Sequence, residues 1–363
     1  MPGRPYLTID LATVRRNVAA LRGALPAAEI RYAVKANPAE PILRLLAGLD
    51  CAFDVASVGE VSLCAAAGID GALMTFGNPL KKPAEIAHAF ARGVRRFTFD
   101  TAAGLAAIAE NAPGSSVECR IAPTFPSSVT PFGHKFGCAP ADAAGLLRQA
   151  ARSGLRADGV AFHVGSQQLD ADAWEIGIRC ARDIFEAVPG LTTLNLGGGI
   201  PISYDAPVPG VAIVGGAIAD ALGRHFPALP HVVIEPGRAV VGSAGTLSSE
   251  VVSVRTGTDG RRWVYLDIGR YGGLAETENE YIRYRLRTNR DSDPVDNAVV
   301  AGPTCDGDDV LYRRYPLPVT LRPGDLVEID AAGAYTTSYA SSFNGFVPLA
   351  TQFVEVTDAV TTG

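Results

Sequence analysis

Short apolar runs alternate with amphipathic stretches between about residue 11 and residue 240. Each run spans only a few residues between polar or glycine-rich breaks, which is the pattern of strands buried in a parallel sheet. The stretches between the runs repeat their apolar residues with the period of a helix that covers such a sheet. The predicted strands are residues 30–37, 52–57, 72–77, 96–100, 117–123, 159–166, 193–199 and 231–238. The predicted helices include residues 41–49, 58–67, 83–92, 139–153 and 172–188.

This alternation predicts an α/β fold. Eight strand-and-helix units within roughly 230 residues fit a TIM-like (β/α)8 barrel, which usually has a similar length. An open, doubly wound sheet is the alternative arrangement of the same units.

The pattern changes after Arg238, where strand-like segments follow one another between turns without a long helix. This is typical of a mostly antiparallel β domain, either a sandwich or a barrel. The strand-like residues 4–11 are expected to join it. We therefore predict a barrel domain of residues 11–240 and a β domain of residues 1–10 and 241–363. The predicted strands of the β domain are residues 244–256, 261–269, 297–303, 317–321, 325–333 and 346–356.

Composition and charge narrow the function classes. The chain has 363 residues, of which 47% are hydrophobic and 19% charged, as in an ordinary folded protein. The net charge of −6 argues against nucleic acid or an anionic membrane as the main partner. No signal-peptide pattern or spanning apolar run is visible, and the six cysteines are scattered without a CxxC pair, so we expect reduced thiols in a cytoplasmic protein. The histidines do not have zinc-binding spacing, and no metal is expected.

Residues that can carry chemistry recur where the predicted barrel strands end. In a (β/α)8 barrel, the working residues lie at the C-terminal ends of the strands. Lysine is rare in this chain, with four lysines against 28 arginines, so a lysine at a strand end suggests a need for its amine. The residues at these ends are Lys35, Asp54, Arg120, His163, Ser166, Gly197, Gly198, Gly199, Glu235 and Arg238.

Lys35 and the three glycines each have two interpretations. A partly desolvated lysine has a lowered pKa and can form a Schiff base with an aldehyde, although Lys35 could also be a strand-end lysine that reaches solvent. The backbone N–H groups of Gly197–Gly199 can wrap a phosphate, although the same glycines could simply form a tight turn.

Two further strand ends carry groups that could bind a flat ring and a phosphate. Glu235 could keep a ring nitrogen protonated, and Arg238 could bind a phosphate. His163 could stack on a flat ring while Ser166 contacts the phosphate. A strand-end ion pair is the alternative for Glu235 and Arg238, and a core histidine is the alternative for His163. A lysine, a phosphate site, an acid for a ring nitrogen and a stacking histidine together match pyridoxal 5′-phosphate (PLP).

Motifs along almost the whole chain resemble those of one family, and they occur in the same order as in that family. They are YAVKAN, FDVAS, KFGC, FHVGSQ, LNLGGGIP, EPGR, GPTCDGDD and GAYTTSYASSFNGF. They are similar to the PLP-dependent decarboxylases of the alanine-racemase-like fold, which act on ornithine, lysine, arginine or diaminopimelate. The resemblance implies that Lys35 binds PLP covalently, that His163 stacks on its ring, and that Glu235 pairs with the ring nitrogen. It implies phosphate contacts from Ser166, Gly197, Gly198, Gly199, Arg238 and Tyr335, and a cofactor contact from Gly237. It implies supporting charges at Asp54, Glu60, Arg120 and Lys135.

The resemblance also implies a homodimer with shared active sites. Cys305 and Asp306 would come from the partner subunit, and Cys305 would return a proton to Cα after carbon dioxide leaves. A buried cysteine beside a turn is the other interpretation of Cys305.

The substrate prediction depends on a few acids. The run CDGDD resembles the ornithine and lysine enzymes, in which Asp306 would face the side-chain amine, and Tyr271 and Phe343 would line the substrate site. Glu276, Glu278 and Glu280 could sense a distal cation, and Glu280 fits best by spacing. A charged, solvated helical turn is the alternative for this segment.

We therefore expect decarboxylation of L-ornithine, L-lysine or both, giving putrescine or cadaverine. Asn279 departs from the acidic residue that is frequent in this branch, so arginine, diaminopimelate or a modified amino acid stay open as substrates. An amino-acid racemase on the same fold would usually place arginine where Glu235 lies. A non-catalytic PLP carrier would tend to lose Lys35, Cys305 or the β domain.

Overall fold

The structure, a computed structural model, describes residues 5–126, 128–132 and 135–356. The chain divides into two compact units. The barrel unit comprises Asn17–Ile202 and Val208–Ala239, and the β unit comprises the residues up to Arg16, Ser203–Pro207 and the residues from Val240 onward.

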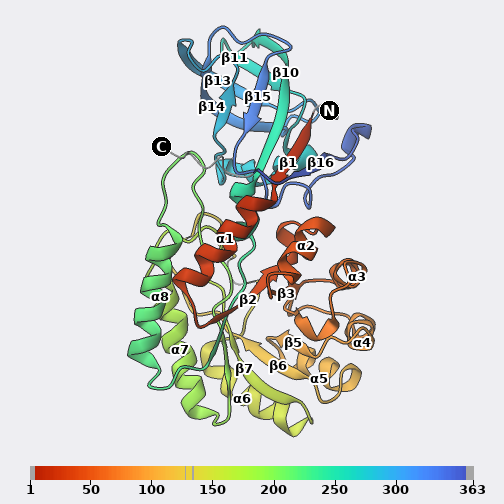
Figure 1. Cartoon of the computed structure of the whole chain (residues 1–363), viewed down its shortest axis with the longest axis vertical. Coiled ribbons are helices and arrows are strands. Elements are labelled where there is room, and N and C mark those ends of the chain that lie inside the picture. The colour runs from red at the N-terminus through yellow and green to blue at the C-terminus, as the bar shows by residue number, and fades with distance from the viewer. Residues whose placement is uncertain (1–4, 127, 133–134, 357–363) are drawn as a thin grey trace. The chain divides into compact units, whose positions relative to one another are not determined.

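The barrel unit is built around a closed parallel sheet (Figure 1). Strands β2 to β9 pair with their neighbours in sequence order, and β9 pairs back onto β2. Closure confirms the predicted (β/α)8 barrel and excludes the open sheet. The strands are β2 (Ala28–Ala33), β3 (Ala52–Val55), β4 (Met74–Phe76), β5 (Arg96–Phe99), β6 (Ser116–Arg120), β7 (Arg156–Ala161), β8 (Thr193–Asn195) and β9 (His231–Ile234).

Helices alternate with these strands along the chain, and the local sequence explains where several of them begin and which face they bury. Ser57 and Thr101 cap α3 and α5 by accepting hydrogen bonds from backbone N–H groups of the first turn. In α7, Trp174, Ile178 and Ala181 recur at helical spacing and are buried. The helices are α1 (Leu11–Ala24), α2 (Glu40–Ala47), α3 (Val58–Ala66), α4 (Pro83–Ala91), α5 (Ala102–Asn111), α6 (Pro140–Arg152), α7 (Ala173–Ala187), α8 (Val211–His225) and α9 (Arg238–Val241).

The first barrel strand is shorter than its sequence pattern suggests. We expected Lys35 to end this strand, but β2 ends at Ala33, and Val34–Ala36 form a 3-10 turn. The next residue, Asn37, is extended, as expected for a residue that precedes proline. Lys35 therefore lies on a turn just beyond the strand.

The β unit contains a mostly antiparallel sheet in the order β12-β15-β10-β11-β13-β14, which confirms the predicted fold class of this part. Strand β1 pairs antiparallel with β10 and parallel with β16. The strands are β1 (Tyr6–Asp10), β10 (Gly245–Thr256), β11 (Arg262–Leu266), β12 (Leu286–Thr288), β13 (Val295–Ala301), β14 (Val310–Pro318), β15 (Leu326–Ile329) and β16 (Ala350–Val354).

Strand β14 is the main departure from the predicted strands of this unit. The predicted strand at 317–321 overlaps β14 only at Leu317 and Pro318, and β12 was not predicted. The pairing of β13 with β14 contains register shifts, and Arg313 and Arg314 interrupt the buried positions. The simple alternation of apolar and polar residues is lost there, so the sequence pattern does not identify the strand.

Among the described residues, no helix has both the length and the apolar character required to cross a membrane.

Candidate active site

Lys35 faces an acid from the neighbouring strand. Its Nζ lies 3.0 Å from Oδ2 of Asp54, which β3 carries. Only 4% of the Asp54 side chain is exposed, whereas 44% of the Lys35 side chain is. The ion pair holds the amine beside the end of β3 and leaves it accessible.

Glu60 supports this pair from α3. Its carboxylate accepts a hydrogen bond of 2.7 Å from the backbone N–H of Ala56, and its own N–H donates to the Ser57 side chain. Burial raises the pKa of Glu60, and the nearby charge of Asp54 acts in the same direction. These two hydrogen bonds at the start of α3 give Glu60 a structural role in addition to its charge.

The glycines after β8 leave no room for side chains. Gly197 and Gly199 have φ values of 65° and 99°, in the left-handed region that favours glycine. A Cβ atom on Gly198 would lie 2.6 Å from the backbone oxygen of Glu235. The bare backbone therefore passes closely over the end of β9.

A buried cation lies at the next strand end. Arg238 is 4% exposed, and its Nη2 donates to Oγ of Ser166 at 3.1 Å. Ser166 is held in turn by two backbone hydrogen bonds with Thr130. Gly237, directly before Arg238, is buried. The predicted phosphate residues Ser166 and Arg238 are thus in direct contact.

His163 lies just after β7 as a neutral imidazole. Burial, with the neighbouring charges of Arg120 and Lys35, holds the pKa of His163 well below its usual value. Its Nδ1 accepts a hydrogen bond of 3.0 Å from the N–H of Gly165, which only an unprotonated nitrogen can do. The Phe132 ring packs against it with the ring centroids 4.5 Å apart. The imidazole offers a fixed flat surface without charge.

Glu235 follows β9 and has a strongly perturbed acidity. Burial raises its pKa to about 7, and the charges of Asp54 and Glu118 act in the same direction, while a 2.6 Å hydrogen bond from Asn195 opposes them. Arg120, the last residue of β6, is also part of this charge cluster. Burial lowers the pKa of Arg120 against the opposing effect of Glu235 and Asp54.

These barrel residues fit PLP on the evidence of their own geometry. The glycine backbone that a Cβ would obstruct can approach a phosphate, with the Arg238–Ser166 pair as a second contact. The amine of Lys35 can attach an aldehyde, and Glu235 can face a ring nitrogen. Nearly all of the predicted cofactor residues occur at the C-terminal ends of the barrel strands or just beyond them.

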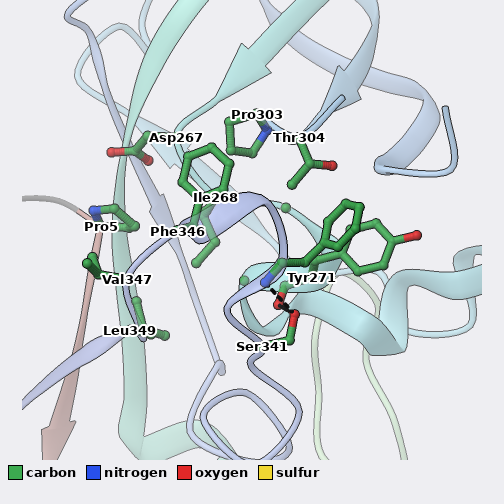
Figure 2. A pocket seen from close by; sticks show the side chains of 13 residues that line it. Pro5, Asp267, Ile268, Tyr271, Pro303, Thr304, Ser341, Phe346, Val347 and Leu349 are labelled. Atoms are coloured by element: carbon green, nitrogen blue, oxygen red, sulfur yellow. Dashed lines mark hydrogen bonds between the residues drawn. The ribbon is translucent and has the colours of Figure 1, made fainter. Parts of the chain in front are cut away.

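A second cluster of predicted residues lies within the β unit. Tyr271 donates from its hydroxyl to Oδ2 of Asp306 at 2.9 Å, and its ring packs on Phe343 with the centroids 4.7 Å apart. The N–H of Asp308 also donates to Asp306, and this bond together with that from Tyr271 holds the pKa of Asp306 below its usual value. Cys305 is exposed and precedes Asp306. Tyr271 lines a pocket of this unit with Thr304 and Phe346 (Figure 2).

Asp309 organises this loop and was not identified from the sequence. Its Oδ1 accepts from the N–H of Arg270, and its Oδ2 accepts from both the N–H and the hydroxyl of Thr304. It is 2% exposed and would collide with a Cβ atom on Gly269 or Gly302. The available signal was its place as the third acid of the turn-forming run CDGDD, because Asp side chains in turns commonly accept from nearby backbone N–H groups.

Glu280 has partners of its own within the β unit. Its carboxylate lies 3.0 Å from Nη1 of Arg283 and accepts a hydrogen bond of 2.9 Å from the N–H of Arg313. Glu278 pairs with Arg270 at 3.4 Å. The segment Ala275–Glu280 begins as a 3-10 turn and leaves helical geometry at Glu278 and Asn279, so a charged helical turn describes only its first part. An ionised carboxylate has about four acceptor sites, so these two contacts leave Glu280 able to accept from a further donor.

Two further predicted residues, Lys135 and Tyr335, belong to segments outside the strand ends described above. Lys135 is exposed, with its Nζ 5.2 Å from the centre of the Phe136 ring. Tyr335 belongs to the β unit and has a φ of 57°, a costly conformation for an aromatic residue. Their predicted contacts with the cofactor stay predictions.

Known proteins match the chain over nearly its whole length. Residues 11–242 match the family model described as pyridoxal-dependent decarboxylase, pyridoxal binding domain. The lysine/ornithine decarboxylase of Selenomonas ruminantium is 37% identical over 349 residues, which cover 94% of this chain and 87% of that enzyme.

Two solved structures are similar at the level of the fold. SrLDC in complex with PLP and cadaverine has a TM-score of 0.89 at 36% identity, covering 97% of this chain and 91% of that one. The lysine/ornithine decarboxylase of Vibrio vulnificus complexed with cadaverine has a TM-score of 0.88 at 32% identity, covering 97% and 95%. The chain therefore belongs to the pyridoxal-dependent decarboxylase family and is a PLP-dependent amino-acid decarboxylase.

Proposed function

We propose that the chain decarboxylates a basic L-amino acid, L-lysine or L-ornithine or both, and releases cadaverine or putrescine with carbon dioxide. Relatives with 37% and 31% identity are a lysine/ornithine decarboxylase and an ornithine decarboxylase. The Vibrio vulnificus enzyme was solved with cadaverine and also with putrescine.

The observation that carries this proposal is the fixed charge of Asp306. Hydrogen bonds from Tyr271 and from the N–H of Asp308 keep its carboxylate ionised, one residue from the Cys305 thiol. An ionised carboxylate attracts a distal ammonium group and repels a distal carboxylate. This favours lysine or ornithine over an acidic substrate.

The barrel residues would hold and tune the cofactor. PLP supplies an electron sink for the pair of electrons left when the bond between Cα and the carboxylate breaks. Lys35 would provide the covalent attachment, and Asp54 would hold its amine while the substrate takes the place of Lys35 on the cofactor. Glu235 would hold a proton at the ring nitrogen, and the neutral His163 would pack against the ring. Gly197–Gly199 would bind the phosphate together with Arg238 and Ser166.

The residues of the β unit would act on the substrate. The Cys305 thiol would give its proton to Cα after carbon dioxide leaves and would then regain one from solvent. The amino acid thus exchanges its carboxylate for a hydrogen atom, and the reaction consumes one proton. Asp306 would orient the distal amine, while Tyr271 and Phe343 would pack along the aliphatic chain. Glu280 stays a candidate for a second contact with that amine.

We also infer a cytoplasmic homodimer in which the β unit of one subunit completes the barrel site of the other. The predicted cofactor residues and the predicted substrate residues lie mostly in different units. Cysteines that are all free thiols support a reducing compartment. Tyr335, although part of the β unit, is proposed to contact the phosphate, and Lys135 is proposed to approach the cofactor.

The experiment that tests this function is a substrate panel with the PLP-loaded enzyme. L-Ornithine, L-lysine, L-arginine and meso-diaminopimelate are supplied separately, and carbon dioxide and the amine product are both quantified. We expect turnover of ornithine or lysine well above that of the other two. If only arginine or diaminopimelate is consumed, the substrate proposal is wrong while the decarboxylase assignment holds.

A further inference from the structure

A charged pair is buried inside the barrel, away from solvent. Arg31 on β2 is 1% exposed, and its Nη1 lies 2.5 Å from Oε1 of Glu118 on β6, which is 2% exposed. Burial alone would lower the pKa of Arg31, but Glu118 and Glu29 hold it above its usual value. A buried ion pair is seldom more stabilising than apolar residues of the same volume, so its presence calls for a reason other than stability.

Asn195, the last residue of β8, connects this pair to Glu235. Its Nδ2 donates to Oε2 of Glu118 at 2.8 Å and to Oε1 of Glu235 at 2.6 Å. Its Oδ1 accepts from the N–H of Gly197 at 3.0 Å. These contacts use both donors of the amide and fix which way it faces. One side chain thus connects the acid at the predicted ring-nitrogen position to the first glycine of the predicted phosphate site.

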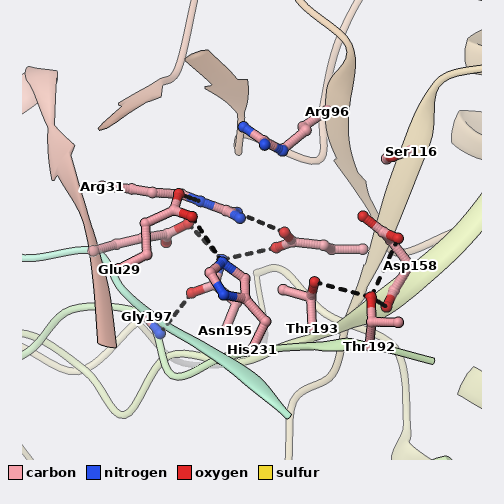
Figure 3. A network of polar contacts seen from close by, with 12 residues as sticks. Glu29, Arg31, Arg96, Ser116, Asp158, Thr192, Thr193, Asn195, Gly197 and His231 are labelled. Carbon is pink, nitrogen blue, oxygen red and sulfur yellow. Dashed lines mark hydrogen bonds and ion pairs between the residues drawn. The ribbon is translucent and has the colours of Figure 1, made fainter. Parts of the chain in front are cut away.

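A second contact of Arg31 begins a chain of residues that reaches the surface of the barrel unit. Its Nε donates to Oε1 of Glu29 at 2.8 Å, and the other oxygen of Glu29 lies 2.7 Å from Nε2 of His231. The side chain of His231 is 49% exposed. In Figure 3, Arg31 and Asn195 reach toward the same carboxylate, and Glu29 and His231 lie near one another.

We propose that Arg31, Glu118 and Asn195 are positioning residues for Glu235. Asn195 aims the Glu235 carboxylate at the ring nitrogen, and Arg31 holds Glu118 so that Asn195 keeps its orientation. The charge of Glu118 also makes the environment of the ring more favourable to a bound proton. This inference rests on the proposed role of Glu235 and adds the network that sets its direction and its electrostatic strength.

Three other charged groups and one ring lie near Glu235, so the electrostatic effect of Glu118 has to be separated from theirs. Asp54 comes from β3, Lys35 from the turn after β2, and Arg120 from β6. The ring of His163 lies near the same strand end. Variants of Glu118 and Asn195 leave all four unchanged, and they alter the number of acids in opposite directions.

The test compares Glu118→Gln with Asn195→Asp in the PLP-loaded enzyme. Glu118→Gln removes a negative charge and keeps an oxygen that can accept from Asn195. Asn195→Asp places a third acid within hydrogen-bond distance of Glu118 and Glu235, so the cluster gains negative charge only as it releases the proton that the three acids share. It keeps an acceptor for the N–H of Gly197. The readouts are the pH at which the visible absorption of bound PLP changes, kcat and KM for lysine and ornithine, and the melting temperature.

We expect the midpoint of the absorption change to move to lower pH in Glu118→Gln and to higher pH in Asn195→Asp. Asn195→Asp also loses the donor to Glu235, so its kcat should fall about tenfold or more with little change in KM. A purely structural network would alter stability without shifts of opposite sign. Unchanged midpoints, or shifts in the same direction for both variants, would overturn the proposal.

The double variant Arg31→Met/Glu118→Met keeps the test decisive if a single variant does not fold. Removing both charges together avoids an unpaired buried ion. Asn195 then loses one acceptor, and we expect kcat to fall about threefold to tenfold while the melting temperature is retained. Wild-type kcat in this folded variant would count against the proposal.

His231→Gln is the matched control, since it alters only the exposed end of the chain of contacts. It should leave kcat and the absorption midpoint unchanged, and an effect as large as that of Asn195→Asp would contradict the inference. If the wild-type protein itself does not bind PLP or release carbon dioxide, the proposed function fails instead, so the two failures are distinguishable.

Discussion

The two units hold their predicted functional residues in different ways. In the barrel unit, these residues follow parallel strands of a closed sheet, and Asp54 and Arg238 are each 4% exposed. In the β unit, Cys305 is exposed on a turn, and Asp306 is held by a tyrosine hydroxyl and a backbone N–H. The barrel site is therefore shaped by the fold itself, whereas the loop site depends on a few local hydrogen bonds.

This difference suggests a division of labour. A cofactor that stays bound through many cycles benefits from a rigid site, because reorganisation at each step would slow the reaction. Residues that meet a passing substrate belong on loops, which vary without disturbing the core. Variants in the barrel should therefore change the binding or the visible absorption of PLP. Variants in the loop should lower substrate turnover while PLP stays bound.

The largest effect is expected from Lys35→Ala. Removal of the amine should abolish the visible absorption of covalently bound PLP and reduce carbon dioxide release at least about a thousandfold. Absorption spectroscopy and a carbon dioxide assay on the same samples measure both. Lys82→Ala, which alters an exposed lysine at the start of α4, is the control. Survival of both signals in Lys35→Ala would contradict the assignment.

Cys305→Ala should separate the two regions most clearly. Loss of the proton donor should reduce kcat by about a hundredfold, while the PLP absorption stays as in the wild type. Steady-state kinetics and an absorption spectrum test this together. Cys180→Ala on α7 is the matched control and should be close to wild type. A loss of bound PLP in Cys305→Ala would show that the division of labour does not hold.

Asp306→Asn should weaken substrate binding with a smaller effect on the chemical step. We expect KM for lysine and ornithine to rise about tenfold to a hundredfold, because a charge-assisted contact is replaced by a neutral one. Tyr271→Phe removes one of the hydrogen bonds that orient Asp306 and should raise KM about twofold to tenfold. An unchanged KM in both variants would remove Asp306 from the substrate site.

The smallest effect concerns the pH dependence of stability in the cofactor-free protein. Glu235 binds a proton in the folded state up to about pH 7, against an ordinary pKa of 4.5. The folded state therefore holds more protons over this interval, so the unfolding free energy should fall as pH rises from 4.5 to about 7. Denaturant unfolding should show that Glu235→Gln lacks this decline. Identical pH profiles would contradict the perturbed acidity.

Asp306 should behave in the opposite way and provides the contrast between the regions. Its pKa is lowered, so its contribution to the unfolding free energy is fully present above the ordinary pKa of 3.8. That contribution is lost as pH falls through the lowered pKa. Asp306→Asn should therefore flatten the acid side of the profile only.

Much of the barrel site could be predicted from the sequence, because a repeating fold determines where side chains gather. Once the strands are assigned, His163 and Glu235 must lie at the same edge of the sheet. The position of Lys35 was less exact, since the apolar residue beside it in the 3-10 turn continues the appearance of a strand. The network of Arg31, Glu118 and Asn195 was not predicted, since no local pattern pairs residues that lie 87 positions apart.

The β unit was harder to predict for a related reason. Register shifts obscure β14, and the loop around Asp309 is stabilised by contacts with Arg270 and Thr304. Such contacts depend on side-chain geometry and leave no periodic signal. The resemblance of CDGDD indicated Cys305 and Asp306, but it did not reveal what holds Asp306 in place.

The central claim is that the barrel of one subunit works with the loop of its partner. A purified heterodimer of a Lys35→Ala chain and a Cys305→Ala chain, each with a different affinity tag, tests it directly. If the sites are shared, one site of the pair contains both intact residues, and the heterodimer should show about half the wild-type activity. If each chain works with its own loop, both sites are damaged, and the heterodimer would be as inactive as the parent homodimers.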